Sequence, residues 1–322
     1  MTASDGAAAS GHTHLTIMVF KAVQNLPLLA AEQQGLFRKY GLSVEMKIAP
    51  NSMELRDGLA AGRYQIVHTA VDNALAMVHD ANIDVAVVMG GDDAFNAVYV
   101  QPEIRSYGDL RGKTVIVDAL DTAFGIKLYA LLARKGLQRG DYDVRSVGAT
   151  YLRYQEMLND RDAKACMLHA PYSILAERAG LRKLDVATEV VGPYQGTAAF
   201  VLRGWAEQNR AVLVRYLRAY IEGLRWALDP KNREGAVGLL MDAIGVPQDV
   251  AAASYVVATD PRHGLARDAA LDLEGFRNVL RIRAEFEGGR AAQPAERYLD
   301  LSSYETALAE LETASAAPVH VA

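Results

Sequence analysis

The 322-residue sequence contains a single cysteine, Cys166, and only two tryptophans. One cysteine excludes an internal disulfide and any zinc site built from several cysteines. Basic residues are not in excess, because 34 Lys and Arg stand against 39 Asp and Glu, giving a formal net charge of −5. Without a basic stripe, we expect no nucleic acid as a partner. No apolar run approaches the ~18 residues that a transmembrane helix needs.

The sequence is also poor in motifs for metal binding and catalysis. His12 and His14 form an isolated H-x-H pair that falls in the N-terminal segment, and no H-x-x-x-H motif accompanies it. Cys166 lies in the apolar run 165–168, which predicts a buried and inert thiol rather than a nucleophile. We therefore expect no cofactor, no metal, no catalytic residues and a protein that is not an enzyme.

Two stretches of the chain, residues 15–80 and 112–180, share one construction in which strands and helices alternate. Strands are marked by alternating or continuous apolar residues, and helices by apolar residues at helical spacing with glycine at their ends. The predicted strands are 14–20, 43–48, 64–69, 83–89, 114–117, 143–147, 164–168 and 197–202. The predicted helices are 27–41, 51–62, 122–135, 151–158, 232–244, 247–257, 273–286 and 304–314.

Two α/β units of this kind predict two lobes with a cleft between them. Turn residues around Pro102 and at Gly192-Pro193 mark the two crossings, and we place the hinge near residues 98–102 and 193–198. The predicted division is a flexible leader over 1–13, a first lobe over 14–100 and 197–314, a second lobe over 101–196, and a flexible tail over 315–322. A cleft between lobes predicts a site for a small molecule.

Candidate ligand contacts follow from the rule that α/β lobes bind ligands outside the carboxyl ends of their strands, at helix N-termini. The residues that we place in the cleft on this basis are Lys21, Gln24, Asn25, Thr69, Asp72, Asn73, Asp92, Asp121, Thr122, Phe124, His169, Tyr172 and Tyr194.

Several of these side chains have two interpretations. Thr122 lies at a predicted helix start, where its hydroxyl contacts a ligand, caps the helix, or does both. Lys21 either pairs with a carboxylate or sulfonate or is a solvated lysine. Asp72 is either a helix cap or a ligand contact. The acidic residues around Asp92 and Asp121 favour a ligand that carries an amino group.

The aromatic residues Phe124, Tyr172 and Tyr194 flank loop positions, so we expect them to wall the pocket. His68 and His169 follow strands of different lobes, and we expect them to face each other across the cleft.

Four segments in register resemble a known family. They are residues 28–42 (LLAAEQQGLFRKYGL), 57–66 (DGLAAGRYQI), 109–115 (DLRGKTV) and 170–172 (APY). The sequence is similar over residues 15–310 to the solute-binding proteins of the taurine–nitrate–sulfonate and thiamine-pyrimidine family of ABC transporters. At Ala170-Pro171 the family usually has a glutamate-proline or similar pair.

The resemblance implies a two-lobed type 2 periplasmic-binding-protein fold, with mixed α/β sheets flanked by helices. It also implies a monomer that closes on a small solute by hinge bending. Its partners would be the membrane permease and ATPase subunits of an importer. Family members place a hydroxyl at the position of Thr122. The family is exported, so we expect a periplasmic protein whose signal peptide, absent from residues 1–10, has been removed.

A second hypothesis stays open at this point. The same fold hosts enzymes and ligand sensors in the cytosol, including relatives of pyrimidine-synthesis enzymes and of desulfinases or decarboxylases. The former carry a cysteine-rich stretch that this sequence lacks, and the latter need a thiol with a base nearby. A signal sequence encoded upstream of Met1, or a neighbouring permease and ATPase, would decide between importer and cytosolic protein.

Overall fold

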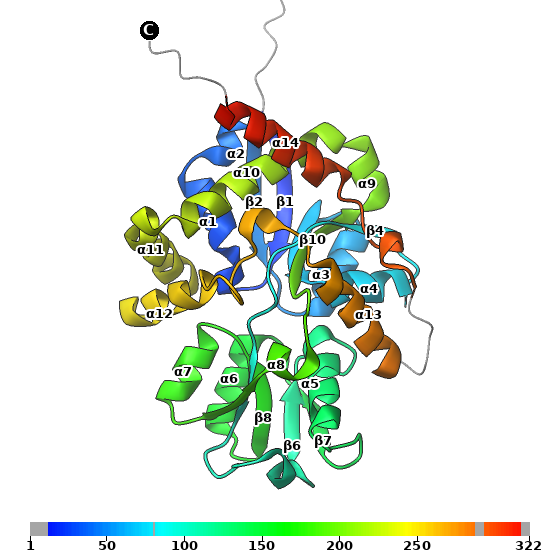
Figure 1. Ribbon diagram of the computed structural model, residues 1–322, viewed down its shortest axis with the longest axis vertical. Coiled ribbons are helices and arrows are strands. Elements are labelled where there is room, and N and C mark those ends of the chain that lie inside the picture. Colours follow the sequence, from blue (N-terminus) through cyan, green and yellow to red (C-terminus); the bar gives the residue numbers. More distant parts are fainter. Residues whose placement is uncertain (1–11, 80, 287–292, 317–322) are drawn as a thin grey trace, which may run out of the picture.

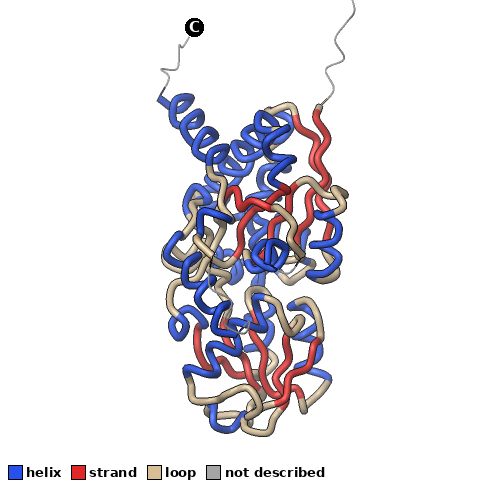
Figure 2. The backbone as a smooth tube through the Cα atoms, turned by 90° about the vertical axis from the view of Figure 1, so that its right-hand side faces the viewer, coloured by secondary structure: helices blue, strands red, loops and turns tan. Residues whose placement is uncertain are grey.

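The computed structural model describes residues 12–79, 81–286 and 293–316, and it has two lobes stacked along the long axis of the molecule (Figure 1). Each lobe is built on a five-stranded sheet with helices on both sides (Figures 1 and 2). The predicted leader and tail fall mostly outside the described residues. The α/β character and the cleft-forming arrangement that the sequence predicted are confirmed.

The sheet of lobe I has the strand order β2-β1-β3-β10-β4. β2 and β3 pair in parallel with β1, whereas β10 runs antiparallel between β3 and β4. The chain thus leaves this lobe after β4 and returns to it with β10. The strands are β1 Thr13–Val19, β2 Leu42–Ile48, β3 Ile66–Ala70, β4 Val85–Met89 and β10 Thr197–Leu202.

The sheet of lobe II has the order β7-β6-β8-β5-β9. β6 is parallel to β7 and β8, and β5 is antiparallel to β8 and β9. The strands are β5 Ala97–Val100, β6 Thr114–Val117, β7 Asp143–Ser146, β8 Ala163–Leu168 and β9 Arg182–Val186. The prediction of a first lobe that runs to residue 100, with a hinge at 98–102, differs here, because residues 97–100 form strand β5 of the second sheet. The first crossing therefore lies at residues 90–96.

Helices cover both sheets. α10 packs against α1 on lobe I, and α13 extends from lobe I to contact α5 of lobe II (Figure 1). The helices are α1 Leu26–Gln33, α2 Leu36–Lys39, α3 Ser52–Ala60, α4 Asp72–His79, α5 Ala123–Arg134, α6 Thr150–Asn159, α7 Tyr172–Arg178, α8 Ala187–Val191, α9 Arg203–Gln208, α10 Arg210–Leu228, α11 Arg233–Ile244, α12 Gln248–Ala258, α13 Leu273–Phe286 and α14 Ser302–Ala316.

One predicted helix is divided in two. The apolar spacing of residues 27–41 predicted a single helix, but α1 ends at Gln33 and α2 begins at Leu36. Gly35 between them has a φ of 66°, a left-handed conformation that side chains disfavour. The apolar face continues through this turn because Phe37 is buried beside Tyr216, with their rings stacked at 5.7 Å.

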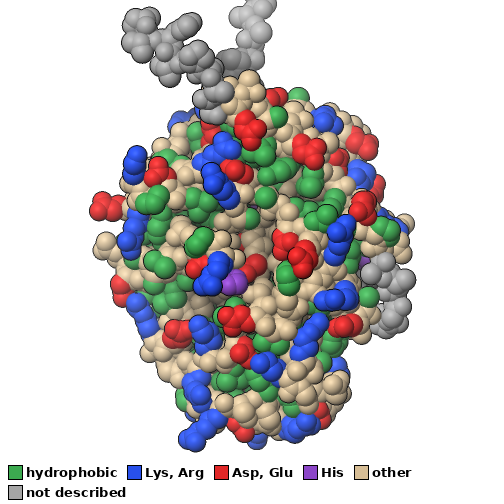
Figure 3. Space-filling model, in the orientation of Figure 1, with side chains coloured by type: hydrophobic (Ala, Val, Ile, Leu, Met, Phe, Trp, Pro, Cys, Tyr) green, Lys and Arg blue, Asp and Glu red, His purple; other side chains and the backbone are tan. Residues whose placement is uncertain are grey.

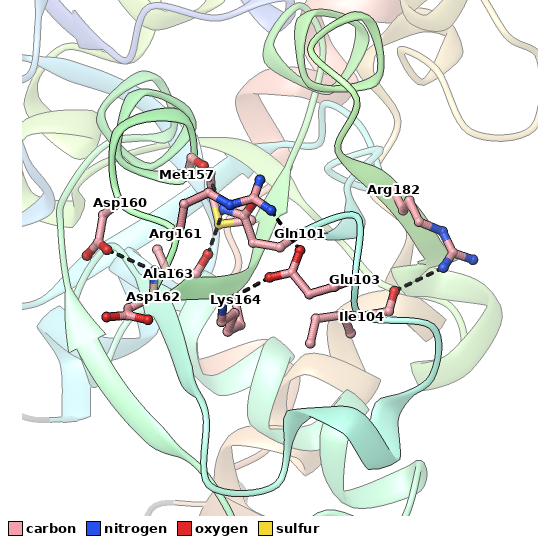
Figure 4. A network of polar contacts seen from close by, with 10 residues as sticks. All are labelled: Gln101, Glu103, Ile104, Met157, Asp160, Arg161, Asp162, Ala163, Lys164 and Arg182. Atoms are coloured by element: carbon pink, nitrogen blue, oxygen red, sulfur yellow. Dashed lines mark hydrogen bonds and ion pairs between the residues drawn. The ribbon is translucent and has the colours of Figure 1, made fainter.

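A polar network fixes the segment of lobe II that follows β5 (Figure 4). The side chain of Gln101 is fully buried, and its amide nitrogen donates to the carbonyl oxygens of Met157 at 2.7 Å and Ala163 at 3.1 Å. Arg161 then donates to the Gln101 amide oxygen at 3.0 Å. Since every polar atom of this buried amide has a partner, the segment after β5 is fixed to the α6–β8 connection.

Within the described residues, no single helix is both long and apolar enough to cross a membrane. One bent pair, Pro230–Ile244 with Gln248–Ala258, meets the length and composition test at an angle of 113°.

The two crossings, residues 90–96 and 192–196, touch through their backbones. Gly196 donates its N–H to the carbonyl oxygen of Asp92 at 2.7 Å, and a Cβ added at Gly196 would lie 2.1 Å from the nitrogen of Ala94. We expect Gly196→Ala to lower the free energy of unfolding by about 1–3 kcal/mol, because one of the two backbone segments would have to move to make room for the methyl group. Urea unfolding measures this change.

Gly204→Ala is the matched control for that substitution. An added Cβ at Gly204, in α9, meets no atom within 4 Å. Helix propensity then predicts an unchanged or slightly higher stability, by at most about 1 kcal/mol. Equal effects of the two substitutions would contradict the close approach of the crossings.

Candidate ligand-binding site

A pocket of about 460 Å³ lies between the two lobes. Lobe I contributes the segment after β1, the end of β3 and the start of α3, and lobe II contributes the segments before α5 and α6 and His169, which follows β8. These are mainly the carboxyl ends of strands and the starts of helices, as expected for an α/β fold. The pocket volume lies within the range of small-molecule sites.

Most of the predicted cleft residues line this pocket. Those that the structure brings together are Lys21, Gln24, Asn25, Thr69, Asn73, Asp121, Thr122, Phe124 and His169. Those that do not line it are Asp72, Asp92, Tyr172 and Tyr194.

The lobe I wall presents amide groups from a short turn after β1. The amide nitrogen of Asn25 donates to the carbonyl oxygen of Phe20 at 2.6 Å, which fixes the turn. The Oε1 atom of Gln24 is buried and has no hydrogen-bond partner among the described residues. Because a buried polar atom without a partner is costly, this oxygen is an acceptor available to a ligand N–H or O–H.

The lobe II wall centres on Thr122, the N-cap residue of α5. Its side chain makes no capping hydrogen bond to the helix. Instead, its hydroxyl contacts the Asp118 carboxylate and lies 3.0 Å from the carbonyl oxygen of Ala119. Burial raises the pKa of Asp118 above its usual value. Thr122 therefore occupies the N-cap position of α5 by its backbone, while its side chain lines the pocket.

Arg153, on α6, lines the pocket and was not predicted from the sequence. Its side chain is 1% exposed, and its guanidinium donates to the carbonyl oxygen of Gly148 at 2.8 Å and to Thr150 at 3.0 Å. It also lies 3.8 Å from Asp118 and 4.7 Å from the centre of the Phe124 ring. This cation is held by the protein itself, so it orders the lobe II wall.

Two uncharged histidines line the pocket from opposite lobes. Burial lowers the pKa of His68 to about 3 and that of His169 to about 4. Nε2 of His68 lies 2.7 Å from the hydroxyl of Tyr216. Both rings are neutral at physiological pH, so the deep part of the pocket has hydrogen-bonding groups without a net charge from histidine.

The tautomer of His169 follows from its partners. Nδ1 lies 2.9 Å from the carbonyl oxygen of Ala170, which can only accept, so Nδ1 carries the proton. Nε2 then accepts from the Thr150 hydroxyl at 3.1 Å. His169 is thus oriented by two partners, and Phe124 packs against it with ring centres 6.0 Å apart.

Asp72 and Tyr194 belong to a buried network beside the crossings rather than to the pocket. The hydroxyl of Tyr194 donates to Asp72 at 2.9 Å, and Arg283 of α13 donates to Asp72 at 3.3 Å. The amine of Lys127 lies 3.8 Å from the centre of the Tyr194 ring, and burial lowers its pKa to about 8. Asp72 and Tyr194, which were predicted as ligand contacts, therefore hold the lobes and α13 together instead.

Asp92 and Tyr172 also have structural partners. Asp92 accepts from the backbone N–H of Ala94 at 2.6 Å and from the Thr197 hydroxyl, and burial raises its pKa to about 6. Tyr172 packs on Tyr154 with ring centres 6.0 Å apart. Asp92 and Tyr194 line a separate cavity of about 760 Å³ beside the crossings. Figure 3 shows charged side chains around a hollow in the middle of the face of the molecule that it presents.

Among the described residues, no group of three or more His, Cys, Asp or Glu side chains could hold a metal ion. Cys166, in β8, is fully buried, and burial raises the pKa of its thiol to about 12. It is not part of the pocket lining.

Solved structures similar to this chain are solute-binding proteins and a fungal protein. The periplasmic nitrate-binding protein NrtA from Synechocystis PCC 6803 is 13% identical, with a TM-score of 0.78 over 95% of this chain and 91% of that one. The aliphatic sulphonate binding protein SsuA from Escherichia coli is 20% identical, with a TM-score of 0.69 over 90% and 91%. A Candida albicans gene product with the generic periplasmic binding protein fold is 12% identical, with a TM-score of 0.68 over 92% and 94%.

At these identities the likeness shows the fold, which is the two-lobed periplasmic-binding-protein fold. No curated protein sequence matches the chain. The sequence model of the NMT1-like family matches residues 8–241, which is more than half of the chain. The chain therefore belongs to the NMT1-like family.

Proposed function

We propose that this protein is the solute-binding component of an ABC importer. It captures a small polar organic solute between its lobes, closes by hinge bending and delivers the solute to membrane permease and ATPase subunits. In this role it works in the periplasm as a monomer. The observation that carries the proposal is the 460 Å³ pocket lined by polar groups of both lobes.

The solute is expected to offer both hydrogen-bond donors and acceptors. Oε1 of Gln24 needs a donor, and the side chains of Asn73 and Thr122 can serve further groups. The solved relatives are named for nitrate and aliphatic sulphonates, which makes sulfonates the first class to test. Carboxylates, taurine and aminopyrimidines follow because the lining carries charged groups of both signs, Arg56 and Asp118 among them.

The chemistry of the pocket supports a binder over a thiol-dependent enzyme. Such an enzyme needs a thiolate near a base, whereas the thiol of Cys166 is fully buried in β8 with its pKa raised to about 12. His169 accepts from Thr150 and donates to a backbone carbonyl, so both of its ring nitrogens already have partners. These partners fix the orientation of the His169 ring in the pocket wall.

Thermal denaturation against a panel of solutes tests the proposal. The panel contains taurine, aliphatic and aromatic sulfonates, nitrate, aromatic carboxylates, aminopyrimidines and amino acids. A true ligand at about 100 times its Kd should stabilise the folded state by ~2.7 kcal/mol, seen as a higher Tm. No shift with any compound would contradict capture of these solute classes.

Gln24→Leu and Thr122→Val locate the binding site in the same assay. Each removes one polar group of the pocket lining, so each should weaken binding by about 1–3 kcal/mol. Glu207→Gln, at an exposed position of α9, is the control and should leave the shift unchanged. A ligand shift that survives both pocket variants would place the solute elsewhere.

A further inference from the structure

Lys21 and Asp121 are opposite charges on opposite walls of the pocket. Lys21 follows β1 of lobe I, and Asp121 comes directly before Thr122, the N-cap of α5 in lobe II. Both residues are exposed and both line the pocket. Within residues 12–79, 81–286 and 293–316, neither side chain has a hydrogen bond or an ion pair.

The other charged side chains of the pocket lining, Arg56, Asp118 and Arg153, each have at least one hydrogen-bond partner. Asp118 contacts the Thr122 hydroxyl and lies 3.8 Å from Arg153. Arg56 donates from Nε to the carbonyl oxygen of Ser52 in its own helix at 3.3 Å. Among the charged side chains of the lining that the structure describes, Lys21 on lobe I and Asp121 on lobe II are those without any hydrogen bond or ion pair, so both are free to take a new partner.

Large apolar side chains accompany these charges on both walls. Ile48 is 53% exposed and Met53 is 64% exposed on lobe I, and both line the pocket. Leu120, beside Asp121 on lobe II, is 55% exposed. Exposed apolar groups gain free energy when a facing surface removes them from water. The two walls are thus complementary in charge, and each lobe has exposed apolar side chains near its charged residue, so each wall suits the other as a partner.

We propose that Lys21 and Asp121 form an ion pair across the mouth of the pocket when the lobes close, with the apolar side chains of the two walls in contact beside it. The inference rests on the hinge closure of the proposed function and names the residues that hold the closed state. An ion pair at a wet rim is weak, so it favours closure without preventing release of the solute.

Zero-length cross-linking of the ligand-free full chain tests the pair. A carbodiimide joins a lysine amine to a carboxylate only where the two groups meet, and the product accumulates even when closed molecules are a minority. Peptide mass spectrometry should find residue 21 joined to residue 121. Two pairs in the structure serve as internal positive controls, Lys39 with Glu222 at 2.8 Å and Lys135 with Asp185 at 2.8 Å.

Two variants separate the pair from accidental reactivity. Lys21→Arg keeps the charge but removes the amine, so the 21–121 product should disappear while the control products remain. The double variant Lys21→Asp/Asp121→Lys exchanges the charges, and the product between the same two positions should return. In 1 M NaCl the yield of the 21–121 product should fall about two- to fivefold, as expected for an exposed pair of this strength.

The proposal is overturned if the control pairs react and the 21–121 product is absent. It is also overturned if Lys21 joins another carboxylate in preference to Asp121, or if the charge-exchanged variant yields no product. The assay contains no solute. A failed cross-link with a successful solute panel therefore rejects the ion pair alone, whereas a failed panel with a successful cross-link rejects the solute classes alone.

Discussion

Acidification from pH 7 to pH 4.5 is expected to lower the free energy of unfolding by about 3 kcal/mol, because two pocket histidines stay neutral in the folded protein. Burial lowers the pKa of His68 to about 3 and that of His169 to about 4. In the unfolded chain a histidine titrates near 6.5. Below pH 6.5 the unfolded chain binds protons that the folded protein does not, so the free energy of unfolding decreases as the pH is lowered.

Two carboxyl groups oppose this trend, Asp118, whose pKa is raised by burial, and Asp92. Burial raises the pKa of Asp92 to about 6. Between this pH and the lower pKa of an aspartate in the unfolded chain, the folded protein binds a proton that the unfolded chain does not, which stabilises the fold. By pH 4.5 the two histidines together lower the free energy of unfolding by about 5 kcal/mol, and Asp92 raises it by about 2 kcal/mol. The histidine contribution is therefore the larger one, and the net effect is loss of stability in acid.

Urea unfolding at pH 7, 5.5 and 4.5 measures this effect. In the double variant His68→Gln/His169→Gln the loss on acidification should vanish, because glutamine does not titrate and the remaining Asp92 acts in the opposite direction. His14→Gln is the control, since the side chain of His14 is 60% exposed on the outside of lobe I. If the double variant loses as much stability in acid as the original protein, the two histidines are not neutral in the fold.

The sequence predicted most strands and helices because their apolar spacing is local. β6, β10 and α13 have the predicted bounds, and β4 is buried along its whole length, as its continuous apolar run implied. β5 was missed because a four-residue strand before Pro102 carries too little alternation to separate it from a crossing. What fixes β5 is the pairing with β8 and β9 and the burial of Gln101, and both depend on distant parts of the chain.

The candidate site was predictable to the level of which loops meet, but not to the level of side-chain direction. Residues after β1 and before α5 come together at the pocket because carboxyl ends of strands share one edge. Asp72 occupies an equivalent position after β3, yet its carboxylate bonds to Arg283, 211 residues away. Arg153 carried no local signal, because a helical arginine is expected on a solvated surface.

Arg283→Met is expected to lower the free energy of unfolding by about 3–5 kcal/mol. Arg283 and Asp72 are 3% and 1% exposed, and the hydroxyl of Tyr194 donates to the same carboxylate. Removing the guanidinium leaves the Asp72 charge buried near Tyr194 without its cation, and the cost of an uncompensated buried charge exceeds that of the lost packing. Urea unfolding at pH 7 measures the change.

Two variants distinguish a buried charge from a simple loss of contacts. In Arg283→Met/Asp72→Asn the uncompensated charge is also removed, so the double variant should be more stable than Arg283→Met alone. Arg63→Met breaks an exposed pair, in which Arg63 lies 3.1 Å from Glu54, and should cost no more than about 1 kcal/mol. A loss in Arg283→Met as small as that in Arg63→Met would mean that the Asp72 carboxylate does not depend on Arg283 in the folded protein. In that case α13 would be held against the crossings by its apolar face, from Phe276 to Ile282, rather than by the ion pair.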